Sequence, residues 1–184
     1  HRPMEAQPKL AHLIRDYLES HQNQMLALLE ALVRAESPTD VPEAQADVQD
    51  ALSRLLRTLD FQVQYLPNGD TYGGHLFAQP TDRPSGRPVQ LLVGHCDTVW
   101  PLGTLQEMPF EIEDNVVRGP GAFDMKGGLV QMLFAIAALR AAPVDPAVVP
   151  VVFINSDEEQ GSPTSQRHIR RLARCAHRAF VLEP

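Results

Sequence analysis

One apolar run in the sequence ends in side chains that could do chemistry: LLVG, at residues 91–94, is followed by His95, Cys96 and Asp97. Because side chains alternate along a strand, His95 and Asp97 point to one side and Cys96 points to the other. An imidazole that binds a metal usually donates its second ring N–H to a carboxylate, and Asp97 is placed to accept it. The same pattern also fits an ordinary histidine at a strand end, so its interpretation depends on the rest of the sequence.

Acidic residues accompany the other apolar runs. Asp157, Glu158 and Glu159 follow VVPVVFINS, Glu183 follows RAFVL, and Asp124 precedes a helix-like segment within GPGAFDMKGG. Each acid has a structural explanation, as a helix N-cap, a solvated turn or a chance residue. If the runs are parallel strands, however, their carboxyl ends meet at the sheet edge where α/β proteins bind ligands. Carboxylates converging there would repel one another unless a cation held them, so we expect a metal site.

These residue types favour a particular class of ion. Oxygen ligands with imidazole and without thiolate suit Zn²⁺, Mn²⁺ or Co²⁺. A carboxylate that can bridge suggests two ions about 3.5–4 Å apart. Of the neighbours Glu158 and Glu159, one can bind metal while the other takes a proton from the water that the metal activates. The glycines could instead form a phosphate-binding loop, but GPGAFD lacks the third glycine of the dinucleotide fingerprint and no GxxxxGK[ST] motif occurs.

The elements that must position these residues follow from hydrophobic periodicity. Apolar residues at helical spacing predict helices over 10–33 and 44–59, separated by Ser37, Pro38 and Thr39. Residues 61–66 and 75–80 are typical of antiparallel or edge strands. Near-continuous apolar runs and helix-like stretches alternate after residue 88, which indicates parallel strands covered on both faces. We therefore expect a three-layer α/β/α sandwich with a mixed, largely parallel sheet. The expected parallel strands are 89–94, 148–155 and 178–182, and the later helices are 126–141 and 162–175.

Composition narrows the class of protein. The chain has 184 residues, 43% of them hydrophobic, and a net charge of -7, so we expect one globular domain that does not bind nucleic acid. No apolar run approaches the roughly 18 residues of a membrane helix, so we expect no membrane partner. Cys96 and Cys175 are too few for a disulfide framework. We expect a cytoplasmic protein, with periplasmic or secreted locations left open because His1, Arg2 and Pro3 precede a methionine.

Three motifs give the chain a specific resemblance. GHCDTVWP, VRGPGAFDMKGG and NSDEEQGS occur in the order and at the approximate spacing found in the glutamate carboxypeptidase (carboxypeptidase G type) family of dinuclear zinc peptidases. That group includes aminoacylase, acetylornithine deacetylase and succinyl-diaminopimelate desuccinylase. The segments LLEALVRAESPTD and FVLEP also resemble this family. The resemblance therefore spans most of the chain.

The resemblance implies a role for each candidate residue. His95 and Glu183 would bind the first zinc, Asp124 would bridge both ions, and Glu159 would bind the second, with Co²⁺ or Mn²⁺ as possible substitutes. By the same resemblance the catalytic residues would be Asp97, which orients the imidazole, and Glu158, the general base. The peptide bond from Asp124 to Met125 is expected to be cis.

The resemblance also implies what the chain would act on. We expect a small peptide or N-acyl amino acid as substrate, with cleavage of an amide next to a C-terminal amino acid such as glutamate. The alternatives are N-acyl-amino-acid or acetylornithine-type deacylation and a non-catalytic metal-binding fragment. Family members are longer, with a dimerisation domain and a final histidine ligand. Residues 1–184 are thus expected to be the N-terminal part of a zinc-peptidase catalytic domain, inactive alone, from a homodimeric enzyme.

Overall fold

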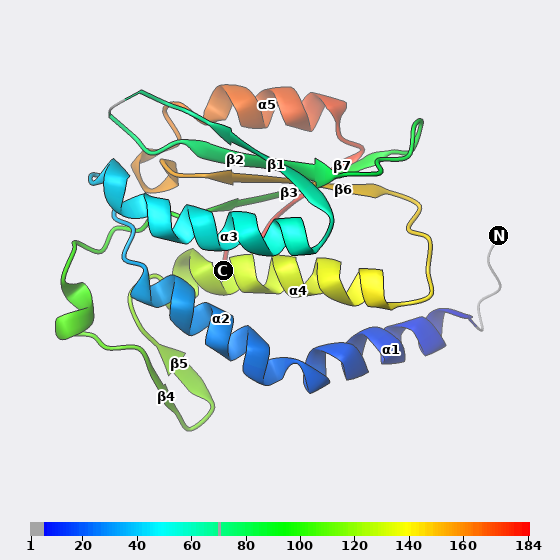
Figure 1. Ribbon diagram of the computed structural model, residues 1–184, viewed down its shortest axis with the longest axis horizontal. Helices are drawn as coiled ribbons and strands as arrows, with labels where there is room; N and C mark the ends of the chain where they lie inside the picture. The colour runs from blue at the N-terminus through cyan, green and yellow to red at the C-terminus, as the bar shows by residue number, and fades with distance from the viewer. Residues whose placement is uncertain (1–5, 70) are drawn as a thin grey trace.

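The computed structural model describes residues 6–69 and 71–184, and shows one five-stranded sheet between helices (Figure 1). The sheet strands are β1 (Phe61–Leu66), β2 (His75–Pro80), β3 (Val89–His95), β6 (Val149–Asn155) and β7 (Arg178–Val181), and a separate hairpin consists of β4 (Glu111–Glu113) and β5 (Val116–Arg118). The helices are α1 (Ala6–Ser20), α2 (Gln22–Arg34), α3 (Ala46–Thr58), α4 (Gly127–Ala141) and α5 (Gln166–Cys175). Short helical turns are η1 (Pro42–Gln45), η2 (Thr104–Gln106), η3 (Ala122–Lys126) and η4 (Glu158–Gln160). Helix α5 covers one face of the sheet, and α1 to α4 lie on the other.

The strand order is β1-β2-β6-β3-β7. β3 runs parallel to both of its neighbours, with Val93 opposite Phe153 of β6 and Val181 of β7. β1 and β2 pair with each other in antiparallel fashion, and β2 pairs antiparallel with β6. The predicted three-layer α/β/α sandwich with a mixed sheet is confirmed, and so is the parallel arrangement of the three apolar runs. Half of the strand pairings in this sheet are antiparallel.

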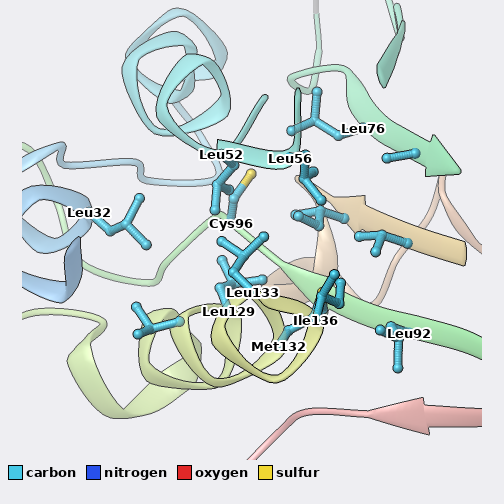
Figure 2. Packing of buried hydrophobic residues seen from close by; sticks show 14 of the residues in the cluster. Leu32, Leu52, Leu56, Leu76, Leu92, Cys96, Leu129, Met132, Leu133 and Ile136 are labelled. Carbon is cyan, nitrogen blue, oxygen red and sulfur yellow. The ribbon is translucent and has the colours of Figure 1, made fainter. Parts of the chain in front are cut away.

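The main core lies between the sheet and helices α3 and α4 (Figure 2). Leu52 and Leu56 of α3 meet Leu129 and Leu133 of α4 there, and each of these side chains is buried. Cys96 belongs to the same cluster, and burial raises the pKa of its thiol to about 12. The alternation expected at the end of β3 is therefore confirmed, because Cys96 points into the core.

One helical segment, Ala122–Ala141, is long and apolar enough by length and composition to cross a membrane. The segment is not a continuous apolar run in the sequence, because Asp124 and Lys126 interrupt the pattern near its start. Half of its most apolar window is buried inside the fold. Met132 and Ile136 pack in the main core, as expected for the core helix of an α/β domain.

Two local features differ from the sequence-based expectations. The helix predicted over 10–33 is two helices that meet at His21, where the Ser20 Oγ and the His21 Nδ1 lie 2.8 Å and 2.7 Å from the Tyr17 carbonyl oxygen. Side chains that bond a backbone carbonyl in this way compete with the regular helix pattern. The β4–β5 hairpin was not predicted at all. Its signal was the pair Asp114 and Asn115, whose positive φ angles of 50° and 63° suit a two-residue hairpin turn.

Candidate metal centre

The candidate residues gather at one edge of the sheet because three parallel strands end there. His95 is the last residue of β3, opposite Asn155 at the end of β6. Glu158 and Glu159 follow β6 in η4, and Glu183 follows β7. Asp124 reaches the same edge from η3, immediately before α4.

The His95 ring is the centre of this group. Its Nε2 atom lies 3.1 Å from Asp124 Oδ1, 3.3 Å from Glu183 Oε1 and 3.8 Å from Glu158 Oε2. Potential ligand atoms of His95, Asp124 and Glu159 lie within 4.8 Å of one another, and so do those of His95, Glu158 and Glu183. The structure therefore brings together all the residues that the sequence marked as metal ligands or base.

The group around His95 is buried on one side and open to solvent on the other. The His95 side chain is 1% exposed, whereas those of Asp124, Glu158 and Glu183 are 54%, 44% and 33% exposed. The imidazole thus forms the floor of the site and the carboxylates form its rim, where a substrate could reach them. A cavity of about 720 Å³ lies elsewhere, at the amino ends of the strands beside Gln90.

The pKa values of three residues at the site are raised where carboxylates lie close together. Burial alone would lower the pKa of His95, but its hydrogen bond to Asp97 and the charges of Asp97 and Glu183 outweigh burial and raise that pKa to about 9. Burial raises the pKa of Glu159 to about 6 against the lowering effect of His95, and the charges of Asp124, Asp97 and Glu158 also raise it. The pKa of Glu183 is also raised, chiefly by burial. A bound dication would relieve this repulsion.

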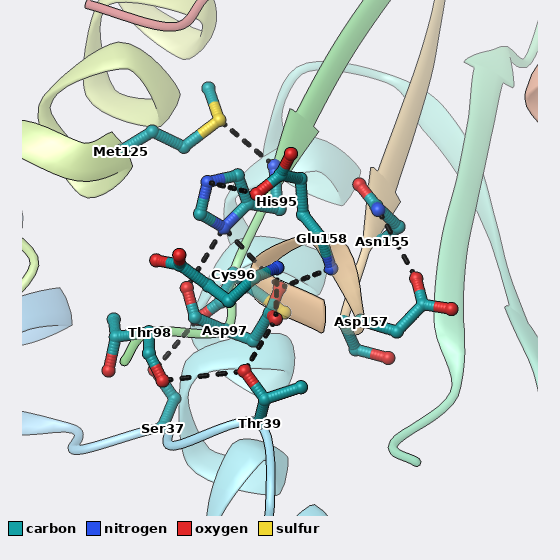
Figure 3. A network of polar contacts seen from close by, with 12 residues as sticks. Ser37, Thr39, His95, Cys96, Asp97, Thr98, Met125, Asn155, Asp157 and Glu158 are labelled. Carbon is teal, nitrogen blue, oxygen red and sulfur yellow. Dashed lines mark hydrogen bonds and ion pairs between the residues drawn. The ribbon is translucent and has the colours of Figure 1, made fainter. Parts of the chain in front are cut away.

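Asp97 connects the imidazole to the loop that carries the glutamates (Figure 3). The His95 Nδ1 lies 2.9 Å from the backbone oxygen of Asp97 and 3.3 Å from its Oδ1. The backbone N–H groups of Glu158 and Glu159 donate to Oδ1 and Oδ2 at 3.3 Å and 3.2 Å. Thr39 Oγ1 donates to Oδ2 at 2.8 Å. The sequence pointed to the contact with His95 but not to the other three.

Asp157, the third acid after β6, does not join the group. Its side chain is fully buried, and its Oδ2 accepts hydrogen bonds from the backbone N–H and hydroxyl of Thr164 at 2.7 Å and 2.6 Å and from the Ser165 N–H at 3.0 Å. Burial alone would raise the pKa of Asp157, but these bonds outweigh it and lower that pKa. Asp157 is therefore neither a solvated acid nor a member of the group around His95; it anchors the start of α5.

Two residues next to Asp124 fix the segment around it. The thioether sulfur of Met125 accepts a hydrogen bond from the His95 backbone N–H at 3.0 Å. The Lys126 Nζ is buried and donates to the carbonyls of Leu32 and Ala35, at 2.8 Å and 2.9 Å. The peptide bond between Asp124 and Met125 is cis, as the resemblance led us to expect. Sequence reasoning missed Met125 and Lys126, although both lie inside the GPGAFDMKGG motif.

The residues present fit a zinc ion. Zinc sites are commonly tetrahedral with bonds to nitrogen and oxygen of about 2.0–2.2 Å, so two ligand atoms on one ion lie roughly 3.3–3.6 Å apart. Asp124 Oδ1 and Glu183 Oε1 lie 3.1 Å and 3.3 Å from His95 Nε2, close to that separation. The donor set is one imidazole with several carboxylates and no thiolate, which also suits Co²⁺ and Mn²⁺.

Comparison with known proteins agrees with this geometry. The model of Peptidase family M20/M25/M40 matches residues 91–183, the segment that contains the whole group around His95. The chain belongs to this family. The resemblance to the glutamate carboxypeptidase and desuccinylase group is thereby confirmed, and the chain is a member of a family of metal-dependent hydrolases.

Individual relatives of this M20 chain are longer than it is. Carboxypeptidase G2 from Pseudomonas sp. (strain RS-16) is 32% identical over 164 residues, which are 89% of this chain and 39% of that protein. Succinyl-diaminopimelate desuccinylase from Acidiphilium cryptum is 35% identical over 140 residues, or 75% of this chain and 35% of that enzyme. Human carnosine dipeptidase 1 has the same fold, with a TM-score of 0.79 at 19% identity, over 92% of this chain and 40% of that one. The chain thus spans well under half the length of these relatives.

Proposed function

We propose that the polypeptide containing this chain is a zinc-dependent hydrolase that cleaves an amide bond next to a C-terminal amino acid, with glutamate as the first candidate. The observation that carries the proposal is the approach of three carboxylates to the Nε2 atom of one buried imidazole, His95. The likeness to carboxypeptidase G2 supports a carboxypeptidase. The proposed substrate is a small peptide or N-acyl amino acid. The proposed active form of the enzyme is a cytoplasmic homodimer.

In the proposed mechanism, His95, Asp124, Glu159 and Glu183 would hold zinc. The ion would polarise the scissile carbonyl and lower the pKa of the attacking water. Glu158 would take a proton from that water while the water oxygen bonds to the amide carbon. Glu158 would then give the proton to the amine nitrogen as the C–N bond breaks. Its 44% exposed side chain is accessible to a substrate.

Asp97 would act on the imidazole and not on the substrate. Its backbone and side-chain oxygens both face the His95 Nδ1, so the ring is held with Nε2 toward the carboxylates. Such outer contacts fix the tautomer of a metal-binding histidine and raise its basicity. The side chain of Asp97 is fully buried, which keeps it out of reach of a substrate.

A second candidate function is removal of an acyl group from an N-acyl amino acid. The likeness to succinyl-diaminopimelate desuccinylase favours it, and the same chemical steps apply because both reactions hydrolyse an amide beside an amino acid. The two functions differ in the part of the substrate that must be recognised. Glutamate recognition requires a cation for the side-chain carboxylate, whereas a deacylase selects the acyl group.

The experiment is a substrate panel on the natural polypeptide that contains these residues, with zinc supplied. The panel compares N-acyl glutamates, dipeptides ending in other amino acids, N-acetylornithine and N-succinyl-diaminopimelate. Fastest turnover of the glutamate compounds supports the carboxypeptidase, and fastest turnover of the last two supports the deacylase. No zinc-dependent amide hydrolysis on any compound would refute the proposed hydrolase.

A further inference from the structure

We propose that Thr39 is a positioning residue for the metal centre, acting through the carboxylate of Asp97. Thr39 does not face the group around His95 itself. Its hydroxyl would set the rotation of the Asp97 carboxylate, and that carboxylate in turn holds the imidazole and the η4 turn. This inference rests on the proposed function, because it assumes that His95 binds a metal ion.

The position of the Thr39 hydroxyl is fixed by the backbone around it. Residues Ser37 to Thr39 lie beside the end of β3, where Pro38 and Thr98 form a parallel bridge. The Thr39 N–H donates to the Thr98 carbonyl at 3.2 Å, and the Thr98 N–H donates to the Ser37 carbonyl at 2.9 Å. Ser37 Oγ adds a bond to the Cys96 carbonyl at 2.7 Å. The segment that precedes η1 is therefore attached along residues 96–98.

Held in this position by the backbone bonds to residues 96–98, the Thr39 hydroxyl has one close acceptor. It lies 2.8 Å from Asp97 Oδ2 and 3.4 Å from the Thr98 carbonyl oxygen, so its single proton goes to the carboxylate. Thr39 is only 4% exposed and the Asp97 side chain is fully buried. A hydrogen bond from a neutral donor to a buried carboxylate is stronger than one between neutral groups. Water cannot readily replace it at this depth.

The other contacts of the Asp97 carboxylate are longer. Glu158 N and His95 Nδ1 each lie 3.3 Å from Oδ1, and Glu159 N lies 3.2 Å from Oδ2. The hydroxyl of Thr39 thus makes the shortest bond that this carboxylate receives. Without it only these longer contacts would hold the carboxylate, which could then turn more easily about its Cβ–Cγ bond. Asp97 would then hold the imidazole and the backbone N–H groups of Glu158 and Glu159 less firmly.

The test replaces the hydroxyl while keeping the shape of the side chain. Thr39→Val removes the donor, Thr39→Ser restores it, and Ser37→Ala removes a hydroxyl of the same segment that bonds a carbonyl instead of Asp97. Loss of an outer partner of a metal ligand typically weakens metal affinity about 10–100-fold. We expect a loss of that size for Thr39→Val, and affinities within roughly threefold of the parent for Thr39→Ser and Ser37→Ala.

The measurement is a Co²⁺ titration of the 184-residue chain followed by visible absorption. A His95→Gln variant gives the signal from cobalt bound elsewhere, for example at the exposed Cys175. Urea unfolding of the metal-free proteins shows whether Thr39→Val and Ser37→Ala lose similar stability. If Thr39→Val does not fold, the smaller Thr39→Ala takes its place.

The outcomes separate the two proposals. If the parent chain binds Co²⁺ through His95 and Thr39→Val binds it equally well, the role of Thr39 is refuted and the metal centre stands. A loss in Ser37→Ala as large as in Thr39→Val would also refute that role, because the effect would then come from the segment and not from the bond to Asp97. If the parent chain binds no Co²⁺ at His95, the metal centre itself fails, and this inference fails with it.

Discussion

Glu183 Oε1 lies 3.3 Å from His95 Nε2, and the register of the sheet places them there. Val93 of β3 is opposite Val181 at the end of β7 in a parallel pair, so the residues two positions further along the chain reach the same level. His95 and Glu183 are those residues. This contact therefore depends on the pairing of β3 with β7 as well as on the two side chains.

Removal of the Glu183 carboxylate should weaken metal binding. Glu183→Gln keeps the size of the side chain but replaces a charged ligand with a neutral one, and we expect a loss larger than the roughly 10–100-fold typical of an outer partner. The measurement is Zn²⁺ affinity by competition with a chelator. The control is Glu113→Gln in the exposed β4 strand, which should leave affinity unchanged. Unchanged affinity in Glu183→Gln would remove Glu183 from the site.

Glu158 and Glu159 should differ in what their loss does. In the active polypeptide, Glu158→Ala should leave zinc content nearly unchanged and lower turnover by about 10²-fold or more, since loss of a general base typically costs about 10²–10⁴. Glu159→Ala should lower zinc content. Metal analysis beside steady-state kinetics distinguishes the two. The structure places each glutamate in a three-residue group with His95, so the reverse pattern would exchange their roles.

The sequence predicted which side chains gather around His95, because strand ends carry strong local signals. His95 and Glu183 each follow an apolar run, and parallel strands necessarily bring such ends to one edge. The outer contacts could not be predicted in the same way. Thr39 meets Asp97 across 58 positions of sequence, and nothing in the SPT segment itself reveals its partner. Nor does the sequence reveal that Lys126, at the start of a helix, is buried against the end of α2.

Lys126 should matter for stability. Its ammonium group donates to the Leu32 and Ala35 carbonyls at the end of α2, so Lys126→Met would leave both carbonyl oxygens without this partner. A buried acceptor left unsatisfied costs about 1–3 kcal/mol, and we expect the free energy of unfolding in urea to fall by that order. Lys9→Met, on exposed α1, is the matched control and should change little. A variant as stable as the parent would show that these bonds contribute nothing net.

His75 should make stability depend on pH. Burial lowers the pKa of His75 below its ordinary value of 6.5, outweighing the raising effect of Asp157, and its ring nitrogens face Ser156 and Thr164. The unfolded chain therefore takes up the proton at higher pH than the folded chain does, so this contribution to stability is lost as pH falls below about 6.5.

Urea unfolding at pH 7.5 and pH 5.5 measures the effect of His75. The fall in the free energy of unfolding between the two pH values should be smaller in His75→Gln than in the parent chain. His12→Gln, which changes an exposed histidine of α1, should keep the parent's pH dependence. An equal fall in His75→Gln and the parent would show that other groups account for it.

The last prediction concerns how many ions these residues can hold. Both three-residue groups at the site contain His95, so the described residues complete only one three-ligand site at a time. Catalytic zinc sites typically have three protein ligands and one open position. We therefore expect the 184-residue chain to keep one Zn²⁺ per molecule after gel filtration, measured by metal analysis, and to bind a second ion weakly. With excess zinc and N-acyl-glutamate substrates we expect negligible turnover, because a second ion held only by Asp124 and Glu159 would have too few ligands to assist the reaction. Two tightly held ions, or robust hydrolysis by this chain, would show that the described residues suffice for the complete centre.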